Sequence, residues 1–127
     1  MNVLILDDTK ERHDAYGRMY SGHNVVHVYR YTQCIDELSR GGWDIVHLDH
    51  DLGDDVINAD TVIDGRGRTR LLTGLDVVRW LGGCDDEMLP KRVIVHSVNP
   101  VGGADMSKEL IARGIPTSWR PFKSLSV

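Results

Sequence analysis

The chain has 127 residues, of which 19 are acidic and 15 are basic, and its formal net charge is −4. This length suits one domain that can bury a hydrophobic core, so we expect a single domain over residues 1–127. Because the net charge is negative, the chain as a whole would not attract duplex nucleic acid electrostatically. Any anionic ligand would need a local binding site.

The N-terminus, MNVLILDD, lacks the charged and apolar regions of a signal peptide. No run of the sequence approaches the roughly 18 apolar residues of a membrane span, so we expect a cytoplasmic protein without a membrane contact. Cys34 and Cys84 lie outside any metal-binding or redox spacing and are interpreted as small buried hydrophobic residues.

Short apolar runs alternate with segments of helical character along the chain. The runs are rich in Val and Ile, which is typical of strands that are covered on both faces. The predicted strands are 2–6, 24–29, 44–48, 92–96 and 115–119, and the predicted helices are about 9–20, 31–40, 73–82 and 104–113. This alternation predicts an α/β fold with a parallel sheet and right-handed crossovers. The connection at about 52–72 is too long for an ordinary turn and is predicted to be a loop insertion.

Polar residues follow the ends of the predicted strands, where ligands bind in an open α/β sheet. They are Asp7 and Asp8 after the first strand, Asp49, His50 and Asp51 after the third, His96, Ser97 and Asn99 at the end of the fourth, and Arg120 and Pro121 after the fifth. Carboxylates that lie this close together repel one another unless a cation neutralises them. We therefore predict that Asp7, Asp8, Asp49 and Asp51 hold a divalent cation, Mg²⁺ or Mn²⁺. The acids of the long connection, Asp54, Asp55, Asp60 and Asp64, are interpreted as solvated surface.

The histidines divide into two groups. His50 and His96 are placed at the predicted sheet edge, where an imidazole can exchange a proton at cellular pH or bind a metal ion. The alternative for His96 is a structural imidazole in the core. The remaining four histidines, His13, His23, His27 and His47, are interpreted as structural.

Two segments suggest contacts with phosphate. The sequence NPVGG precedes a predicted helix, so Gly102 and Gly103 predict a phosphate cradle at a helix N-terminus. The sequence GRGRTR contains Arg66, Arg68 and Arg70, whose guanidinium groups could clamp phosphate oxygens if this loop closes over a ligand. A solvated run of charge is an equal alternative for the loop. Trp119 precedes Arg120 and is a candidate for stacking on a base.

These residues resemble the receiver domain of two-component signalling. The matching positions are the acidic pair Asp7 and Asp8, the strand-end Asp49, the hydroxyl residue Ser97 and the basic-Pro pair Arg120 and Pro121. The resemblance implies a flavodoxin-like three-layer sandwich whose five-stranded parallel sheet has the order 2-1-3-4-5. The chain departs from receivers by carrying Arg120 where they have Lys. Only FKSLSV remains where they have a last helix, so we expect that helix to be short or absent.

Three segments, LDDTKERHDAY, LDHDLG and VHSVNPVGGADM, more specifically resemble cyclic-phosphate-processing receiver domains. This resemblance implies an enzyme that acts on cyclic phosphates of nucleotides or ADP-ribose, in RNA repair or in conflict between phages and bacteria. Our main expectation is therefore a phosphodiesterase with a small cyclic-phosphate or nucleotide ligand. In that account Asp49 and the cation act on the phosphoryl group, and His50 and His96 share the base and acid roles. The phosphate would be held by Ser97, Asn99, Gly102, Gly103, Arg66, Arg68 and Arg120, with Trp119 against a base.

Several points stay open at this stage. The cation is not strictly required, because two histidines can serve acid/base hydrolysis without a metal. One alternative function is a signalling receiver that is phosphorylated on Asp49. Another is a protein that binds a cyclic nucleotide without cleaving it. The sequence does not distinguish a monomer from a homodimer.

Overall fold

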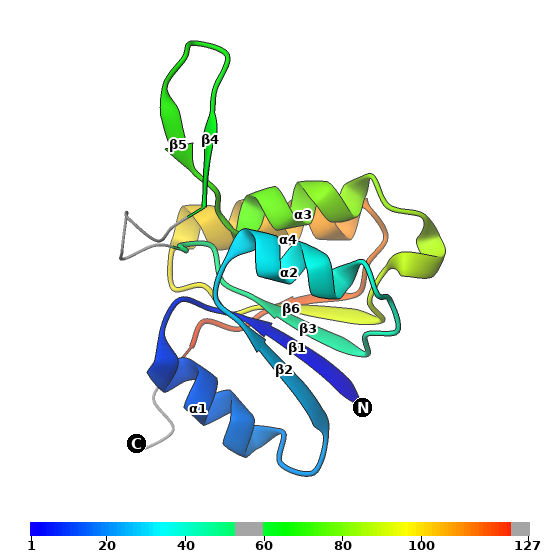
Figure 1. Cartoon of the computed structure of the whole chain (residues 1–127). Coiled ribbons are helices and arrows are strands. Elements are labelled where there is room, and N and C mark those ends of the chain that lie inside the picture. Colours follow the sequence, from blue (N-terminus) through cyan, green and yellow to red (C-terminus); the bar gives the residue numbers. More distant parts are fainter. Residues whose placement is uncertain (53–59, 123–127) are drawn as a thin grey trace.

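The computed structural model describes residues 1–52 and 60–122, and these form a parallel sheet flanked by helices (Figure 1). The strands of the sheet, in spatial order, are β2 (Asn24–Val28), β1 (Asn2–Leu6), β3 (Ile45–Leu48), β6 (Arg92–Val95) and β7 (Thr117–Trp119). Each neighbouring pair is parallel. Numbered by their order along the chain, the five strands therefore have the order 2-1-3-4-5, which confirms the predicted sheet.

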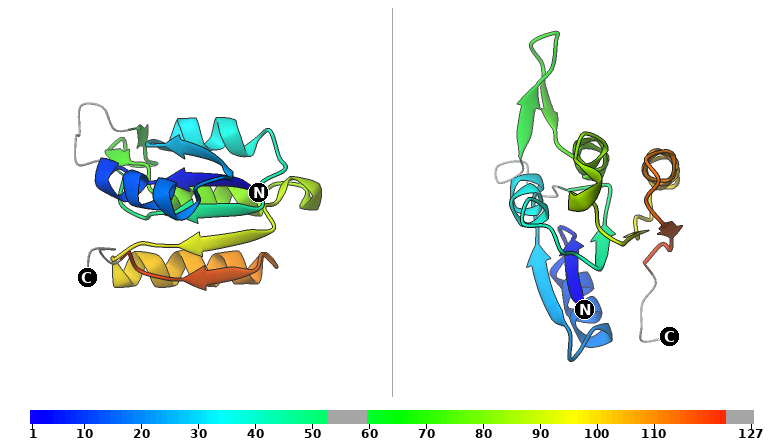
Figure 2. Two further views of the ribbon diagram at one scale, coloured as in Figure 1. Left: turned by 90° about the horizontal axis from the view of Figure 1, so that it is seen from below. Right: turned by 90° about the vertical axis from the view of Figure 1, so that its right-hand side faces the viewer.

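The helices lie on both faces of the sheet, three on one face and one on the other (Figures 1 and 2). Helices α2 (Tyr31–Leu38), α3 (Gly74–Gly82) and α4 (Pro100–Ala112) cover the first face. Their buried side chains form the main hydrophobic core with Leu4, Val46 and Val93 of the strands. Helix α1 (Lys10–Met19) covers part of the second face, where a smaller cluster contains Val3, Ile5 and Tyr16.

Helix α4 begins at Pro100, four residues before the predicted start at 104. Pro is favoured in the first turn of a helix because its missing N–H would have no partner there. The side chain of Asn99 caps the helix by accepting a hydrogen bond from the Gly102 N–H at 3.0 Å. Gly102 and Gly103 therefore lie inside the helix and not in a loop before it. The helix is followed by Gly114 at φ +89°, as its predicted place after a helix end requires.

The long connection contains a hairpin that the sequence analysis did not predict. Strands β4 (Thr61–Ile63) and β5 (Thr69–Leu71) pair antiparallel, and the hairpin projects away from the rest of the domain (Figure 1). Asp60, at the base of the hairpin, connects the hairpin to α2. The Asp60 carboxylate accepts hydrogen bonds from the backbone N–H and the hydroxyl of Thr32. A short 3₁₀ helix, Asp86–Met88, follows α3.

Three sequence predictions fall partly or wholly outside the described residues. They concern Asp54, Asp55 and the segment 123–127, which was expected to be a short helix or none. Within the described residues, no helix is long and apolar enough to cross a membrane. The cytoplasmic location stays a prediction.

Candidate functional site

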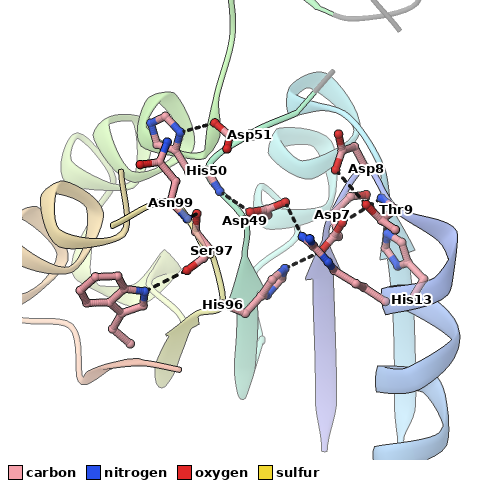
Figure 3. Close-up of polar contacts among 12 residues, drawn as sticks. Asp7, Asp8, Thr9, His13, Asp49, His50, Asp51, His96, Ser97 and Asn99 are labelled. Atoms are coloured by element: carbon pink, nitrogen blue, oxygen red, sulfur yellow. Dashed lines mark hydrogen bonds and ion pairs between the residues drawn. The ribbon is translucent and has the colours of Figure 1, made fainter. Parts of the chain in front are cut away.

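The acidic site lies at the carboxyl edge of the sheet and is built from three buried side chains. Asp7 follows β1 and is 0% exposed, Asp49 follows β3 and is 3% exposed, and His96 follows β6 and is 0% exposed. Because the three strands are parallel, their carboxyl ends meet at the same edge (Figure 3). One ligand atom from each of these side chains lies within 4.8 Å of the other two.

The Asp7 carboxylate is hydrogen-bonded to His96 and Thr9, in addition to the Arg12 contact described below. Its Oδ2 lies 2.7 Å from His96 Nε2, and its Oδ1 accepts a hydrogen bond from the Thr9 N–H at 2.8 Å. Burial alone would raise the pKa of Asp7, but the hydrogen bond and charge of His96 lower it below the usual value. Asp7 is therefore a stable anion in the folded protein.

Asp49 has the opposite electrostatic environment. Burial, followed by the negative charge of Asp7, raises its pKa to about 7, against the opposing effect of Arg12. Its Oδ1 accepts a hydrogen bond from the His50 N–H at 2.8 Å, and its Oδ2 faces Arg12. A cation placed between Asp7 and Asp49 would stabilise the ionised form of Asp49.

Arg12 is a site residue that the sequence analysis missed. Its Nη1 lies 3.5 Å from Asp7 Oδ2 and 3.3 Å from Asp49 Oδ2, so one guanidinium bridges the two carboxylates. The guanidinium also lies over the ring of Phe122, at 5.5 Å from the ring centroid. The sequence did carry a signal, because Arg12 lies in the first turn of α1, which begins shortly after the strand-end acids Asp7 and Asp8.

The described cluster fits a divalent cation by the chemistry of its donors. Carboxylate oxygens suit Mg²⁺ and Mn²⁺, and an imidazole nitrogen is an accepted additional ligand for transition metals. Of the four predicted metal ligands, the structure brings Asp7 and Asp49 together and adds His96. Asp8 lies beside them and accepts a hydrogen bond from the Thr9 hydroxyl at 3.3 Å. Asp51 is exposed and points toward His50 instead (Figure 3).

His50 and Asp51 form a pair beside the acidic site. His50 Nδ1 lies 2.8 Å from Asp51 Oδ1, with the His50 side chain 19% exposed and that of Asp51 64% exposed. The imidazole packs on the backbone of Gly102, where a Cβ atom would collide with the ring. Gly102 therefore permits the close approach of α4 to His50.

Ser97, Gly103 and Trp119 form a second packed group. Ser97 is 0% exposed, and its hydroxyl accepts a hydrogen bond from the Asn99 N–H at 3.1 Å. The indole Nε1 of Trp119 donates to the Ser97 carbonyl at 3.0 Å, and the ring packs on Gly103. The two glycines predicted to cradle phosphate are thus covered by aromatic rings, Gly102 by His50 and Gly103 by Trp119. Both lie within α4, and neither is part of an open loop.

The predicted phosphate-binding arginines lie apart from the acidic site. Arg66 and Arg68 are exposed in the turn of the projecting hairpin, and Arg68 pairs with Asp64 at 3.3 Å. Arg70 pairs with Asp76 at 3.0 Å. Arg120 lines a groove on the α1 face of the sheet, and no hydrogen bond or ion pair joins its side chain to the acidic site within the described residues.

The parallel sheet, its order and the strand-end acids define a receiver-like α/β domain. A family model described as "Cyclic-phosphate processing Receiver domain" matches residues 2–112, and the chain belongs to this family. The family description names the processing of cyclic phosphates, but it does not establish enzymatic activity in this chain. A search of curated proteins finds no match.

Several solved structures that share this fold are described as receiver domains or response regulators. The signal receiver domain of a protein described as a Luxo repressor, from Vibrio parahaemolyticus, is 20% identical with a TM-score of 0.62, and the match covers 96% of this chain and 79% of that one. A CheY-like receiver domain from Methylobacillus flagellatus is 17% identical with a TM-score of 0.62, covering 98% and 87%. A response regulator from Burkholderia pseudomallei, solved with a phosphorylated aspartic acid, calcium ion and citrate, is 13% identical with a TM-score of 0.61, covering 98% and 62%. These likenesses show the fold.

The expectation of a cyclic-phosphate phosphodiesterase is wrong as the main function, and the findings favour the alternative, a signalling receiver. The three solved structures named above are described as receiver domains or a response regulator, and none of these descriptions names a phosphodiesterase. The geometry supplies a physical reason. His96 is fully buried and its Nε2 is hydrogen-bonded to Asp7, while the His50 imidazole is paired with Asp51 and packs on Gly102 of α4. The two histidines expected to share the acid and base roles are therefore each paired with a different carboxylate.

Proposed function

We propose that this chain is a phospho-accepting receiver module whose acceptor is the carboxylate of Asp49. The single observation that carries the proposal is the position of Asp49 directly after the central strand β3, where Arg12 bridges its carboxylate and that of the stable anion Asp7. A response regulator of the same fold was solved with a phosphorylated aspartic acid, which supports this choice of reaction.

The reaction is a phosphoryl transfer to one carboxylate oxygen of Asp49. That oxygen forms a bond to phosphorus, the bond from phosphorus to the donor's leaving oxygen or nitrogen breaks, and the electron pair leaves with the donor. Asp49 must be ionised to attack, so its raised pKa restrains the reaction when no further cation is present. Arg12 reduces this restraint by placing positive charge 3.3 Å from the attacking carboxylate.

A divalent cation is the second part of the proposal. Asp7 and Asp49, with His96 or Asp8 as a further ligand, are the residues that would hold it. When bound, the cation would neutralise charge on the carboxylates and on the incoming phosphoryl oxygens. Arg12 now occupies the space between the two carboxylates, so its guanidinium must shift when the cation or the phosphoryl group enters.

Acetyl phosphate with Mg²⁺ tests the acceptor directly, with intact mass as the readout. We expect the parent protein to gain the mass of one phosphoryl group and Asp49→Asn to gain none. Asp51→Asn is the matched control, because Asp51 is two residues away and exposed, and it should be labelled like the parent. Labelling of Asp49→Asn at the parent's level would show that another residue is the acceptor.

A further inference from the structure

A groove on the α1 face of the sheet lies outside the acidic site. Its volume is about 220 Å³, and it is lined mainly by Tyr16, Tyr20, His47, Ile94, Arg120 and Phe122. Helix α1 supplies Tyr16, the residue directly after the helix is Tyr20, and strands β3 and β6 supply His47 and Ile94. The proposed function uses none of the polar groups in this groove.

The floor of the groove is formed by well-packed side chains of the sheet. His47 is 2% exposed and Ile94 is 6% exposed, so both are fixed by the packing of the sheet. The Tyr20 hydroxyl lies 2.6 Å from His47 Nε2, and the ring centroids of Tyr16 and His47 are 4.5 Å apart. The other ring nitrogen of His47, Nδ1, is buried and has no hydrogen-bond partner among the described residues. Unpaired polar groups of this kind are uncommon in packed interiors and call for an explanation.

The charge around the groove is positive and unbalanced. Arg92 and Arg120 are the charged groups that act on the Tyr20 hydroxyl, and the same two arginines with His96 act on His47. Arg92 donates a hydrogen bond to the Ser118 hydroxyl at 2.8 Å. Neither arginine forms an ion pair with a carboxylate in the part of the chain that the structure describes.

We propose that this groove binds a small aromatic carboxylate. An apolar wall of Tyr16, Ile94 and Phe122 suits an aromatic ring, and a cavity of about 150 Å³ already holds benzene, so one ring with a carboxylate fits the observed volume. The carboxylate would face Arg120, whose planar guanidinium matches it in a bidentate pair. The Tyr20 hydroxyl lines the same groove and is a further donor when His47 Nε2 carries the ring proton and donates to it. The proposal goes beyond the phosphoryl acceptor and does not depend on it.

Three probes of nearly equal shape separate charge from apolar burial. We would titrate the full chain with benzoate, benzyl alcohol and benzylamine and follow backbone amide shifts by NMR. Benzoate should shift the amides of Tyr20, Ile94 and Arg120, benzyl alcohol should bind more weakly, and benzylamine should not bind. Arg120→Gln should weaken benzoate binding about tenfold or more, because it removes a charge-assisted hydrogen bond. Tyr20→Phe should weaken binding by a smaller factor.

Arg30→Gln is the matched control, since Arg30 is an exposed arginine outside the groove and should leave benzoate binding unchanged. Three results would overturn the proposal. They are the absence of benzoate shifts at the groove, equal binding of benzoate and benzylamine, and benzoate binding by Arg120→Gln at the parent's affinity. None of these results bears on Asp49, so failure here and failure of the phosphoryl-acceptor proposal are distinguishable.

Discussion

His96 and Asp7 form a fully buried pair that crosses the central strand β3, with His96 Nε2 at 2.7 Å from Asp7 Oδ2 and both side chains 0% exposed. Removal of one member of such a pair leaves the other polar group buried and uncompensated. We expect His96→Phe to lower the free energy of unfolding by about 3 kcal/mol, measured by urea denaturation at pH 7. The double variant Asp7→Asn with His96→Phe should recover part of this loss, because no buried carboxylate then lacks its imidazole partner. If the loss in the double variant equalled the sum of the losses in the two single variants, the pairing of Asp7 with His96 would be contradicted.

Arg12 is predicted to compete with a divalent cation. Its guanidinium lies within 3.5 Å of an oxygen of both Asp7 and Asp49, so it adds positive charge where the cation would enter. Arg12→Gln should bind Mn²⁺ roughly tenfold more tightly than the parent, because this repulsion is removed. Isothermal titration calorimetry measures the difference. Arg18→Gln, an exposed change on the same helix, should bind like the parent. Weaker Mn²⁺ binding by Arg12→Gln would argue against competition.

The raised pKa of Asp49 predicts a pH-dependent gain of stability in Asp49→Asn. Burial and the charge of Asp7 raise the pKa of Asp49 from 3.8 to about 7 on folding. The protonated form is therefore favoured in the folded state, and this contribution is present below about pH 4 and lost as the pH rises through 7. The amide in Asp49→Asn does not ionise, so the variant does not lose stability in this way. The free energy of unfolding of the variant minus that of the parent should therefore grow between pH 4 and pH 7, to roughly a few kcal/mol at pH 8.

Urea denaturation of parent and variant across this pH range, with a chelator present, measures the advantage. Addition of Mg²⁺ should shrink it, because a bound cation stabilises ionised Asp49 in the parent. An advantage that stays constant from pH 4 to pH 8 would show that Asp49 does not titrate in this window.

Gly103 is predicted to be required for the packing of α4 on Trp119. A Cβ atom at position 103 would lie 2.5 Å from the indole ring, which is too close for unstrained contact. Gly103→Ala should lower the melting temperature by an amount equivalent to about 1–3 kcal/mol, by overpacking. Gly82→Ala is the control, because Gly82 is in α3 with open space around it and should be neutral or stabilising. The loss at Gly103 should shrink in a Trp119→Leu background if the ring contact causes it.

The sequence predicted the sheet and its four flanking helices because Val- and Ile-rich runs and helical segments alternate clearly along the chain. The start of α4 was placed too late, because the Gly pair at 102 and 103 was interpreted as a loop when it is a close-packed face of the helix. The hairpin in the long connection was missed. Its strands are three residues each and exposed, so they carry no alternation of buried and exposed positions.

The acidic residues could be assigned to one sheet edge from the ends of parallel strands alone. The sequence could not show which of these side chains contact one another, because that depends on the direction in which side chains from different helices and strands point. Arg12 approaches the site from helix α1, and Asp51 turns away from it toward His50, although Asp51 is only two residues from Asp49. His47 was interpreted only as a structural histidine, and its burial and its unpaired ring nitrogen became evident with its neighbours in place.

The most direct test of the central claim is to identify the residue that carries the phosphoryl group. The protein would be incubated with acetyl phosphate and Mg²⁺, reduced with borohydride to convert an acyl phosphate into homoserine, and mapped by peptide mass spectrometry. The same preparation would be incubated with nucleoside 2′,3′-cyclic phosphates and assayed for ring opening. We expect homoserine at position 49 and no ring opening. An unlabelled protein that opens the cyclic phosphates would contradict it.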